Sequence, residues 1–249
     1  YWQEEFHIAS QIGLDCVEFI LDFNDIGLNP LVQSGGVSEI KTLMSNTGVK
    51  VKTICADYLM EAPIHSEDLG LSSYSQALLI TLIKNACFLG VTDIVIPCVD
   101  QSSLIDKASE NRFVEMLLPL VSLAEQNCIN LSLETDLAPK PFKKLLNRFN
   151  SKKVTVNYDI GNSAAMGFNP VEELDVYGDR ITDIHIKDRI LGGGPILLGN
   201  GNADFDIFFE KLKEFNYQGP YIMQAYRDEE GVDIFRKQLD WVKPYLTNA

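Results

Sequence analysis

The sequence is poor in histidine and in positive charge, and both shortages exclude classes of function. Its 249 residues include only three histidines, and 35 Asp and Glu against 21 Lys and Arg give a net charge of −14. Nucleic-acid and anionic-membrane surfaces need clustered Lys and Arg, so neither is expected. Endonuclease-type metal clusters need many histidines and are excluded too. An anionic small substrate stays open, because a local field can oppose the net charge.

Long apolar runs, a signal-peptide pattern and paired cysteines are also missing. No apolar stretch approaches the ~20 residues that span a bilayer. The cysteines are odd in number, lack C-x-x-C spacing, and lie mostly in or beside apolar stretches. We therefore expect reduced, buried thiols in a cytoplasmic protein, with no zinc–thiolate site. These cysteines are Cys16, Cys55, Cys87, Cys98 and Cys128.

Strand and helix patterns alternate along the whole chain, with no linker or low-complexity segment between them. We expect strands over Cys16–Leu21, Val49–Ala56, Asp93–Cys98, Asn130–Glu134, Val154–Asp159, Ile181–Arg189 and Tyr221–Gln224. Helices are expected over Glu4–Ile12, Ser38–Asn46, Leu71–Leu89, Glu110–Asn127, Pro139–Phe149, Pro170–Tyr177, Asp206–Phe215 and Val232–Tyr245. Such repeated units predict parallel strands with right-handed crossovers, in one domain over residues 1–249.

The polar residues on the strands favour a barrel over an open sheet. In Ile181–Arg189, Asp183, His185 and Lys187 share one face while isoleucines occupy the other. An open sheet covered on both sides would be nearly continuously hydrophobic, whereas the inner face of a barrel leads to a polar mouth. We predict an α/β fold, a (β/α)8 TIM barrel. Its first strand is absent because the sequence starts within a helix, so we expect the domain to be incomplete at its N-terminus.

Four polar residues end consecutive predicted strands, where the active site of such a barrel lies. They are Glu134, Asp159, His185 and Gln224. A lone histidine at a strand end is often a core residue, but two carboxylates, an imidazole and an amide oxygen together suit a divalent metal. Mn²⁺, Mg²⁺ and Co²⁺ fit hard oxygens with one nitrogen, and zinc is an alternative.

Five segments resemble the xylose isomerase-like sugar phosphate isomerase/epimerase barrels. They are GLDCVEFILD at 13–22, NLSLET at 130–135, VNYDIGNSAAMG at 156–167, ITDIHIKDR at 181–189 and NGNADF at 200–205. The resemblance implies one divalent metal, Mn²⁺ before the others, at Glu134, Asp159, His185 and Gln224. It also implies that the first and last carboxylates move a proton between adjacent carbons of a sugar, through a metal-stabilised enediolate.

The chain departs from this family at two positions. Gln224 stands where the family has its last glutamate, and an amide cannot accept the proton. The charge of the ligand set falls from −3 to −2, and one general base is lost. Asn162 stands where relatives commonly carry histidine after Asp-x-Gly, which alters a substrate hydrogen bond.

Further residues are candidates beside these ligands. Lys187 could tune His185 or supply the second proton, and is grouped with Glu134 as catalytic. Substrate-binding candidates, each with a structural alternative, are Glu18 (a contact to Lys187), His65 in the loop MEAPIHSED (a solvated residue), Asn162, Arg189 (a loop ion pair) and Arg227. The glycine-rich segment from Gly192 to Gly201 could cover the mouth or bind phosphate.

The leading hypothesis is an enzyme, a metal-dependent isomerase or epimerase of a sugar or sugar phosphate. A dehydratase or other enolate-forming lyase needs only one base and is the first alternative. A sugar-binding barrel that has lost turnover through Gln224 is the second. A homodimer or homotetramer is compatible with each of these readings.

Overall fold

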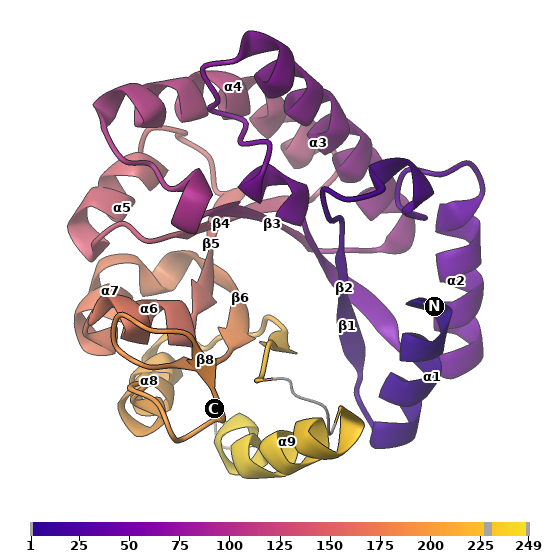
Figure 1. Ribbon diagram of the computed structural model, residues 1–249. Coiled ribbons are helices and arrows are strands. Elements are labelled where there is room, and N and C mark those ends of the chain that lie inside the picture. The colour runs from indigo at the N-terminus through magenta and orange to yellow at the C-terminus, as the bar shows by residue number, and fades with distance from the viewer. Residues whose placement is uncertain (1, 227–230, 248–249) are drawn as a thin grey trace. The chain divides into compact units, whose positions relative to one another are not determined.

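The computed structural model describes residues 2–226 and 231–247, whose helices and strands are drawn in Figure 1. The chain forms two compact units. The first unit comprises Tyr1–Thr135 and Leu145–Thr155, and the second comprises Asp136–Lys144 and Val156–Ala249. The chain crosses between them three times, directly after Thr135, within helix α5 (Pro139–Leu146) and within strand β5 (Val154–Asp159).

The first unit is a parallel sheet with helices on its outer side (Figure 1). Neighbouring strands pair in the order β1-β2-β3-β4, all parallel. The strands are β1 (Cys16–Ile20), β2 (Lys50–Cys55), β3 (Asp93–Cys98) and β4 (Asn130–Thr135). The helices are α1 (Trp2–Ile12), α2 (Gly36–Thr47), α3 (Leu69–Leu89) and α4 (Lys107–Gln126), with short 3₁₀ turns η1 (Ile26–Leu28), η2 (Asp57–Met60) and η3 (Asp100–Ser102).

Local sequence signals explain where the long helices of this unit begin and end. The Asp68 side chain accepts hydrogen bonds from the backbone N–H groups of Gly70 and Leu71, which caps α3. Gly90 ends α3 in the left-handed conformation at φ 75°, which glycine adopts without strain. All six residues of β3 are buried, as expected for a parallel strand covered on both faces.

The second unit holds three parallel strands in the order β5-β6-β9, with β6 at Ile181–Ile186 and β9 at Tyr221–Met223. A small antiparallel hairpin joins β7 (Asp188–Arg189) to β8 (Pro195–Ile196). The other helices are α6 (Ile160–Met166), α7 (Pro170–Tyr177), α8 (Phe205–Leu212) and α9 (Val232–Leu246), with 3₁₀ turns η4 (Gly178–Arg180) and η5 (Lys213–Phe215).

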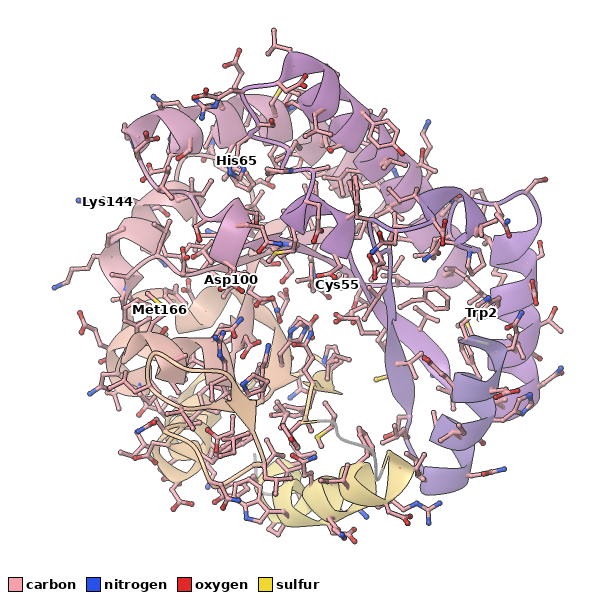
Figure 2. All side chains as sticks on the ribbon, in the orientation of Figure 1. Trp2, Cys55, His65, Asp100, Lys144 and Met166 are labelled. Atoms are coloured by element: carbon pink, nitrogen blue, oxygen red, sulfur yellow. The ribbon has the colours of Figure 1, made fainter. Side chains whose placement is uncertain are left out.

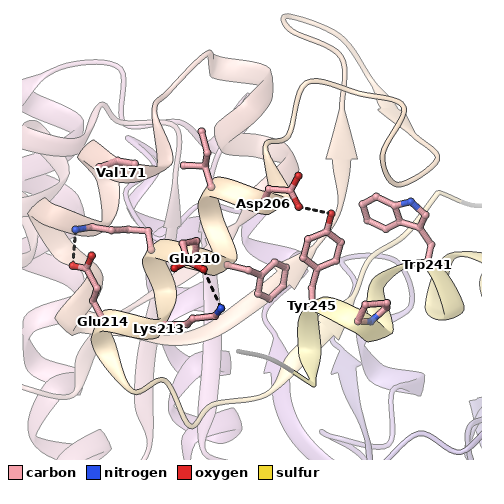
Figure 3. A pocket seen from close by; sticks show the side chains of 11 residues that line it. Val171, Asp206, Glu210, Lys213, Glu214, Trp241 and Tyr245 are labelled. Atoms are coloured by element: carbon pink, nitrogen blue, oxygen red, sulfur yellow. Dashed lines mark hydrogen bonds and ion pairs between the residues drawn. The ribbon is translucent and has the colours of Figure 1, made fainter.

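Aromatic side chains hold α8 against α9. The Trp241 ring meets Phe205 edge-on at 5.0 Å between centroids, and Tyr245 stacks on Phe209 at 5.2 Å. The Tyr245 hydroxyl donates to Asp206 Oδ1 at 2.9 Å (Figure 3). Four of these residues (Asp206, Phe209, Trp241 and Tyr245) line a groove over α7, α8 and α9, and none of the predicted site residues lines it.

All seven predicted strands are present, but several boundaries were wrong. The strand expected over Ile181–Arg189 ends at Ile186, and its last two residues pair instead with Pro195–Ile196. Helix α5 ends at Leu146 rather than at Phe149, whose ring is buried. The short helix α6 was not predicted, because it follows β5 with no intervening loop.

The cysteine prediction was right about disulfides and partly wrong about burial. None of the five thiols, all of which lie in the described residues, forms a disulfide. Only Cys55 and Cys98 are buried, both on strands, while Cys87 on an outer helix and Cys128 in a left-handed turn are exposed. Among the described helices, none combines the length and the apolar character required to cross a membrane.

Candidate active site

Asp159 and His185 lie side by side at the carboxyl ends of two neighbouring strands of the second unit. Strands β5 and β6 are parallel, and their register pairs Asp159 with His185. Both side chains are buried, at 5% and 0% exposure. A carboxylate oxygen of Asp159 and a ring nitrogen of His185 come within 4.8 Å of each other, which is close enough for both to bind one ion.

The Asp159 carboxylate is held in a fixed orientation because it also caps a helix. Its Oδ1 accepts the backbone N–H of Asn162 at 2.8 Å, at the start of α6. A negative charge at this end of a helix is favourable, and the cap satisfies one of the N–H groups that lack a helical partner. The second oxygen, Oδ2, is turned toward Lys187.

The Lys187 ammonium bridges two of the predicted metal ligands. Its Nζ lies 3.4 Å from Asp159 Oδ2 and 3.4 Å from Gln224 Oε1. Gln224 follows β9 directly, and its backbone N–H continues the sheet by donating to the Ile186 carbonyl at 3.0 Å. The lysine therefore places a positive charge and a proton donor next to the amide that replaces the expected glutamate.

A glycine makes room for this lysine. A Cβ atom at Gly161 would lie only 2.9 Å from Lys187 Cγ, so any other residue would displace the lysine stem or helix α6. The sequence pattern Asp-x-Gly thus combines a helix cap at Asp159 with close packing two residues later.

Polar neighbours surround the His185 ring. Its Nδ1 lies 3.1 Å from Asn157 Nδ2, and its Nε2 lies 4.0 Å from Asp183 Oδ2. A half-turn of the Asn157 amide exchanges its oxygen and nitrogen, and the oxygen would then accept a proton from Nδ1. In that arrangement Nε2 keeps its lone pair for a metal, which is the usual role of such a partner.

Arg189 and Asn162 are joined by a hydrogen bond between their side chains. Arg189 Nη1 donates to Asn162 Oδ1 at 2.8 Å, and its Nε donates to the Gly193 carbonyl at 3.0 Å. The arginine therefore ties the turn of the β7–β8 hairpin to the first turn of α6. Within the described part of the chain, Arg189 forms hydrogen bonds to an amide and a carbonyl in place of the loop ion pair that was its structural alternative.

The buried Asp188 organises the glycine-rich segment. Its carboxylate accepts the backbone N–H groups of Gly199, Gly201 and Ala203 at 3.0, 2.9 and 3.1 Å. A Cβ atom at Gly201 would lie 2.1 Å from Asp188 Oδ1, so this close approach requires glycine. These N–H groups already have an anionic partner within the protein, which indicates a structural role for them.

The first unit supplies two of the predicted carboxylates. Glu134 is the penultimate residue of β4 and is 7% exposed. Glu18 on β1 accepts a hydrogen bond from Thr53 Oγ1 at 2.8 Å. It also lines a pocket of about 340 Å³ with Trp2, Phe19 and Asn24. Arg227, the remaining substrate-binding candidate, lies outside the described residues.

His65 is buried beside helix α4, and the alternative of a solvated loop histidine was wrong (Figure 2). Its ring packs edge-on against Phe113, and Arg112 Nε donates to its backbone carbonyl at 2.9 Å. Burial first, and then the charge of Arg112, lower the pKa of His65 to about 4.

This low pKa predicts a pH-dependent stability. Between pH 6.5 and pH 4, His65 is protonated in the unfolded chain but not in the folded chain. The free energy of unfolding should therefore decrease as the pH is lowered. The slope is at most about 1.4 kcal/mol per pH unit. Urea unfolding between pH 7 and pH 5 should show this slope reduced in His65→Gln and kept in His7→Gln, since His7 is an exposed histidine on α1. Equal slopes in both variants would contradict the assignment.

The sequence of the whole chain matches one protein family. Residues 6–245 fit the xylose isomerase-like TIM barrel. The chain belongs to this family. Its parallel strands and alternating helices are those of a TIM barrel, as the sequence predicted.

Individual proteins and solved structures are similar over nearly the full chain. L-ribulose-5-phosphate 3-epimerase UlaE of Escherichia coli O1:K1 / APEC is 26% identical over 263 aligned residues, covering 100% of this chain and 91% of the relative. The apo structure of 3-keto-D-glucoside 4-epimerase YcjR from E. coli has a TM-score of 0.79 at 19% identity, covering 97% and 94% of the two chains. The IolI protein with a bound zinc atom has a TM-score of 0.78 at 17% identity, covering 99% and 91%.

Three residues of the candidate site were not predicted as site residues from the sequence. Asn157 and Asp183 flank the His185 ring, and Asp188 holds the glycine-rich segment. The period-two pattern of the strands carried a signal for the first two, because Asn157 shares a face with Asp159 and Asp183 shares one with His185. No such signal marks Asp188, whose partners come 11 to 15 residues later.

Proposed function

We propose that the protein is an epimerase or isomerase that acts on a sugar or sugar phosphate through an enediolate. The observation that carries this proposal is the pairing of Asp159 and His185 at adjacent strand ends, with Lys187 and Gln224 beside them. The sugar epimerases among the relatives support an enzyme that acts on a carbohydrate. The proposal includes both free sugars and sugar phosphates as substrates.

The donors in the second unit fit a divalent metal. Asp159 and His185 are buried and their ligand atoms are close enough to share an ion. We assign the remaining positions to Glu134, from the end of β4, and to the amide oxygen of Gln224. Mn²⁺ suits this set of hard oxygens and one imidazole, and Mg²⁺, Co²⁺ and Zn²⁺ are alternatives. The ion would polarise the carbonyl of the sugar.

Two side chains carry the proton transfer in this proposal. The Glu134 carboxylate takes the proton from the carbon next to the carbonyl; the C–H electron pair forms the carbon–carbon double bond, and the carbonyl π pair moves to oxygen. A proton returned to the opposite face gives the epimer. Lys187 supplies it, because its ammonium lies at Gln224, in the place of the missing second carboxylate.

Residues around these groups position the substrate. Asn162 and Arg189 form one hydrogen-bonded pair at the start of α6, and we assign them to a substrate hydroxyl or phosphate. Glu18 lines a pocket and is assigned to a hydroxyl. Substrate contacts by His65 and Arg227, a cytoplasmic location and a homo-oligomer stay predictions.

The proposal is tested by solvent exchange. Incubation in D₂O with a panel of ketoses and their phosphates should place deuterium on the carbon beside the carbonyl, as read by NMR, without knowledge of the product. Metal analysis after gentle purification should give one divalent ion per chain, and Mn²⁺ should raise the Tm of chelator-treated protein. No exchange with any sugar, or no metal and no Tm shift, would defeat the corresponding part of the proposal.

The solvent-exchange experiment also distinguishes an epimerase from the first alternative, a dehydratase or another enolate-forming lyase. Gln224 leaves the site one carboxylate short, and a dehydratase or another enolate-forming lyase needs only one base. Such an enzyme would consume the sugar with loss of water, and the NMR spectrum would show a new keto-deoxy product in place of an epimer. Saturable sugar binding without exchange or consumption would instead indicate a barrel that binds and does not turn over.

A further inference from the structure

A buried carboxylate behind the site has no part in the proposed reaction. Glu173 on α7 is 3% exposed. Its Oε2 accepts hydrogen bonds from the hydroxyls of Tyr158, at 2.7 Å, and Ser163. Its Oε1 accepts one from the Tyr177 hydroxyl at 2.7 Å. Three donors from three positions thus converge on one carboxylate.

The two oxygens of Glu173 have different partners in the fold. Tyr177 lies one turn further along α7, so the bond to Oε1 stays within that helix. Tyr158 precedes Asp159 on β5, and Ser163 follows Asn162 on α6. The bonds to Oε2 therefore connect α7 to the two elements that carry Asp159 and Asn162.

The buried Glu173 carboxylate has a desolvation cost that a purely stabilising role would not require. Burial raises the pKa of Glu173, and the hydroxyl bonds oppose that rise. Apolar residues of similar size would fill such a position without the desolvation cost of a charge. The aromatic rings around it are already packed, since Tyr158 stacks on Phe208 at 4.8 Å and Tyr177 meets Phe142 at 5.1 Å. A carboxylate at this position therefore does more than fill space.

Helix α6 needs an external support because it is short. It has seven residues, and helices of that length are unstable without tertiary contacts. At its start, the Asn162 N–H binds Asp159 Oδ1, and the Asn162 side chain binds Arg189. A small tilt of α6 would lengthen both bonds. The bond of Ser163 to Glu173 is the next contact along the helix.

We propose that Glu173 is a positioning residue that holds α6 against β5 and thereby fixes the Asp159 carboxylate and the Asn162–Arg189 pair. The proposal rests on the function proposed above for Asp159 and Asn162. Glu173 acts through Ser163 and Tyr158, not by contact with the substrate.

Two variants that each remove one hydroxyl from the same carboxylate test this role. Ser163→Ala breaks the bond to α6, whereas Tyr177→Phe breaks a bond of the same kind within α7. We expect kcat for solvent exchange to fall about tenfold in Ser163→Ala and less than twofold in Tyr177→Phe, with similar Tm changes in both. Ser163→Thr keeps the hydroxyl and should restore most of the rate.

A second measurement does not depend on activity. Amide hydrogen exchange followed by mass spectrometry should show faster exchange over residues 160–166 in Ser163→Ala, and wild-type exchange there in Tyr177→Phe. Equal rate losses in the two variants, or unchanged amide exchange over α6 in Ser163→Ala, would overturn the proposal. If the wild-type protein exchanges no sugar proton, the proposed function fails, and amide exchange still decides whether Glu173 holds α6.

Discussion

Replacing Glu134 by glutamine is expected to slow deuterium incorporation into the sugar by about 10²–10⁴-fold, the range typical for loss of a general base. Glutamine keeps the shape and the hydrogen-bonding oxygen of the side chain but cannot accept a proton. Glu134 is buried at the end of β4, and the alternative carboxylate at the last strand is already an amide in this chain. No second base is therefore expected to rescue the variant.

The matched control for Glu134→Gln is Glu115→Gln. Glu115 is an exposed glutamate on α4 of the same unit, and its replacement makes the same chemical change without touching a strand end. Tm and near-UV circular dichroism should be close to wild type in both variants. An exchange rate within tenfold of wild type in Glu134→Gln would remove this residue from its proposed role as base.

The opposite substitution at the last strand should increase activity. Gln224→Glu introduces the carboxylate that the family resemblance implies at this position, and we expect epimer formation to rise by about 10²-fold or more. The Lys187 ammonium, 3.4 Å from Gln224 Oε1, would keep the new carboxylate ionised and able to accept a proton. The added negative charge should also tighten Mn²⁺ binding, as measured by titration of the chelator-treated protein.

The variant Gln224→Met tests whether the amide oxygen of Gln224 is a metal ligand, separately from the effect of a new general base. Methionine keeps the length of the side chain but offers neither an amide oxygen nor a charge. If the amide oxygen is a ligand, Mn²⁺ binding should weaken in Gln224→Met and strengthen in Gln224→Glu. An unchanged or lower rate of epimer formation in Gln224→Glu would mean that the amide has a role of its own in the reaction, and that the chain is not an attenuated two-base enzyme.

The sequence predicted the strands well because their signal is local. Runs such as DIVIPC at 93–98 and VTVNYD at 154–159 are buried strands with few other interpretations. The candidate site was predicted from the ends of strands, because parallel strands bring their last residues to one edge of a sheet. Asp159 is the last residue of β5, His185 is the penultimate residue of β6 and Gln224 directly follows β9.

What the sequence missed depends on residues distant along the chain. The His65 ring packs against Phe113, and burial first, and then the charge of Arg112, lower its pKa. Both of these neighbours lie on a helix 47 or more residues later. Lys187 lies just beyond β6, because the strand ends at Ile186, and its partners come from β5 and from the segment after β9. Neither contact has a periodic pattern, so hydrophobic spacing could not reveal it.

Because the aromatic cluster between α8 and α9 contains a tryptophan, the intrinsic fluorescence of the protein can report on its unfolding. The chain has two tryptophans, and they belong to different units. Trp2 meets Phe19 of the first unit at 5.5 Å, while Trp241 packs on Phe205 and against Gly199, the glycine whose backbone N–H donates to Asp188. With Trp2 replaced by Phe, the remaining fluorescence reports on the second unit and its glycine-rich segment. With Trp241 replaced by Phe, the emission comes from the first unit, so the melting of each half can be followed separately.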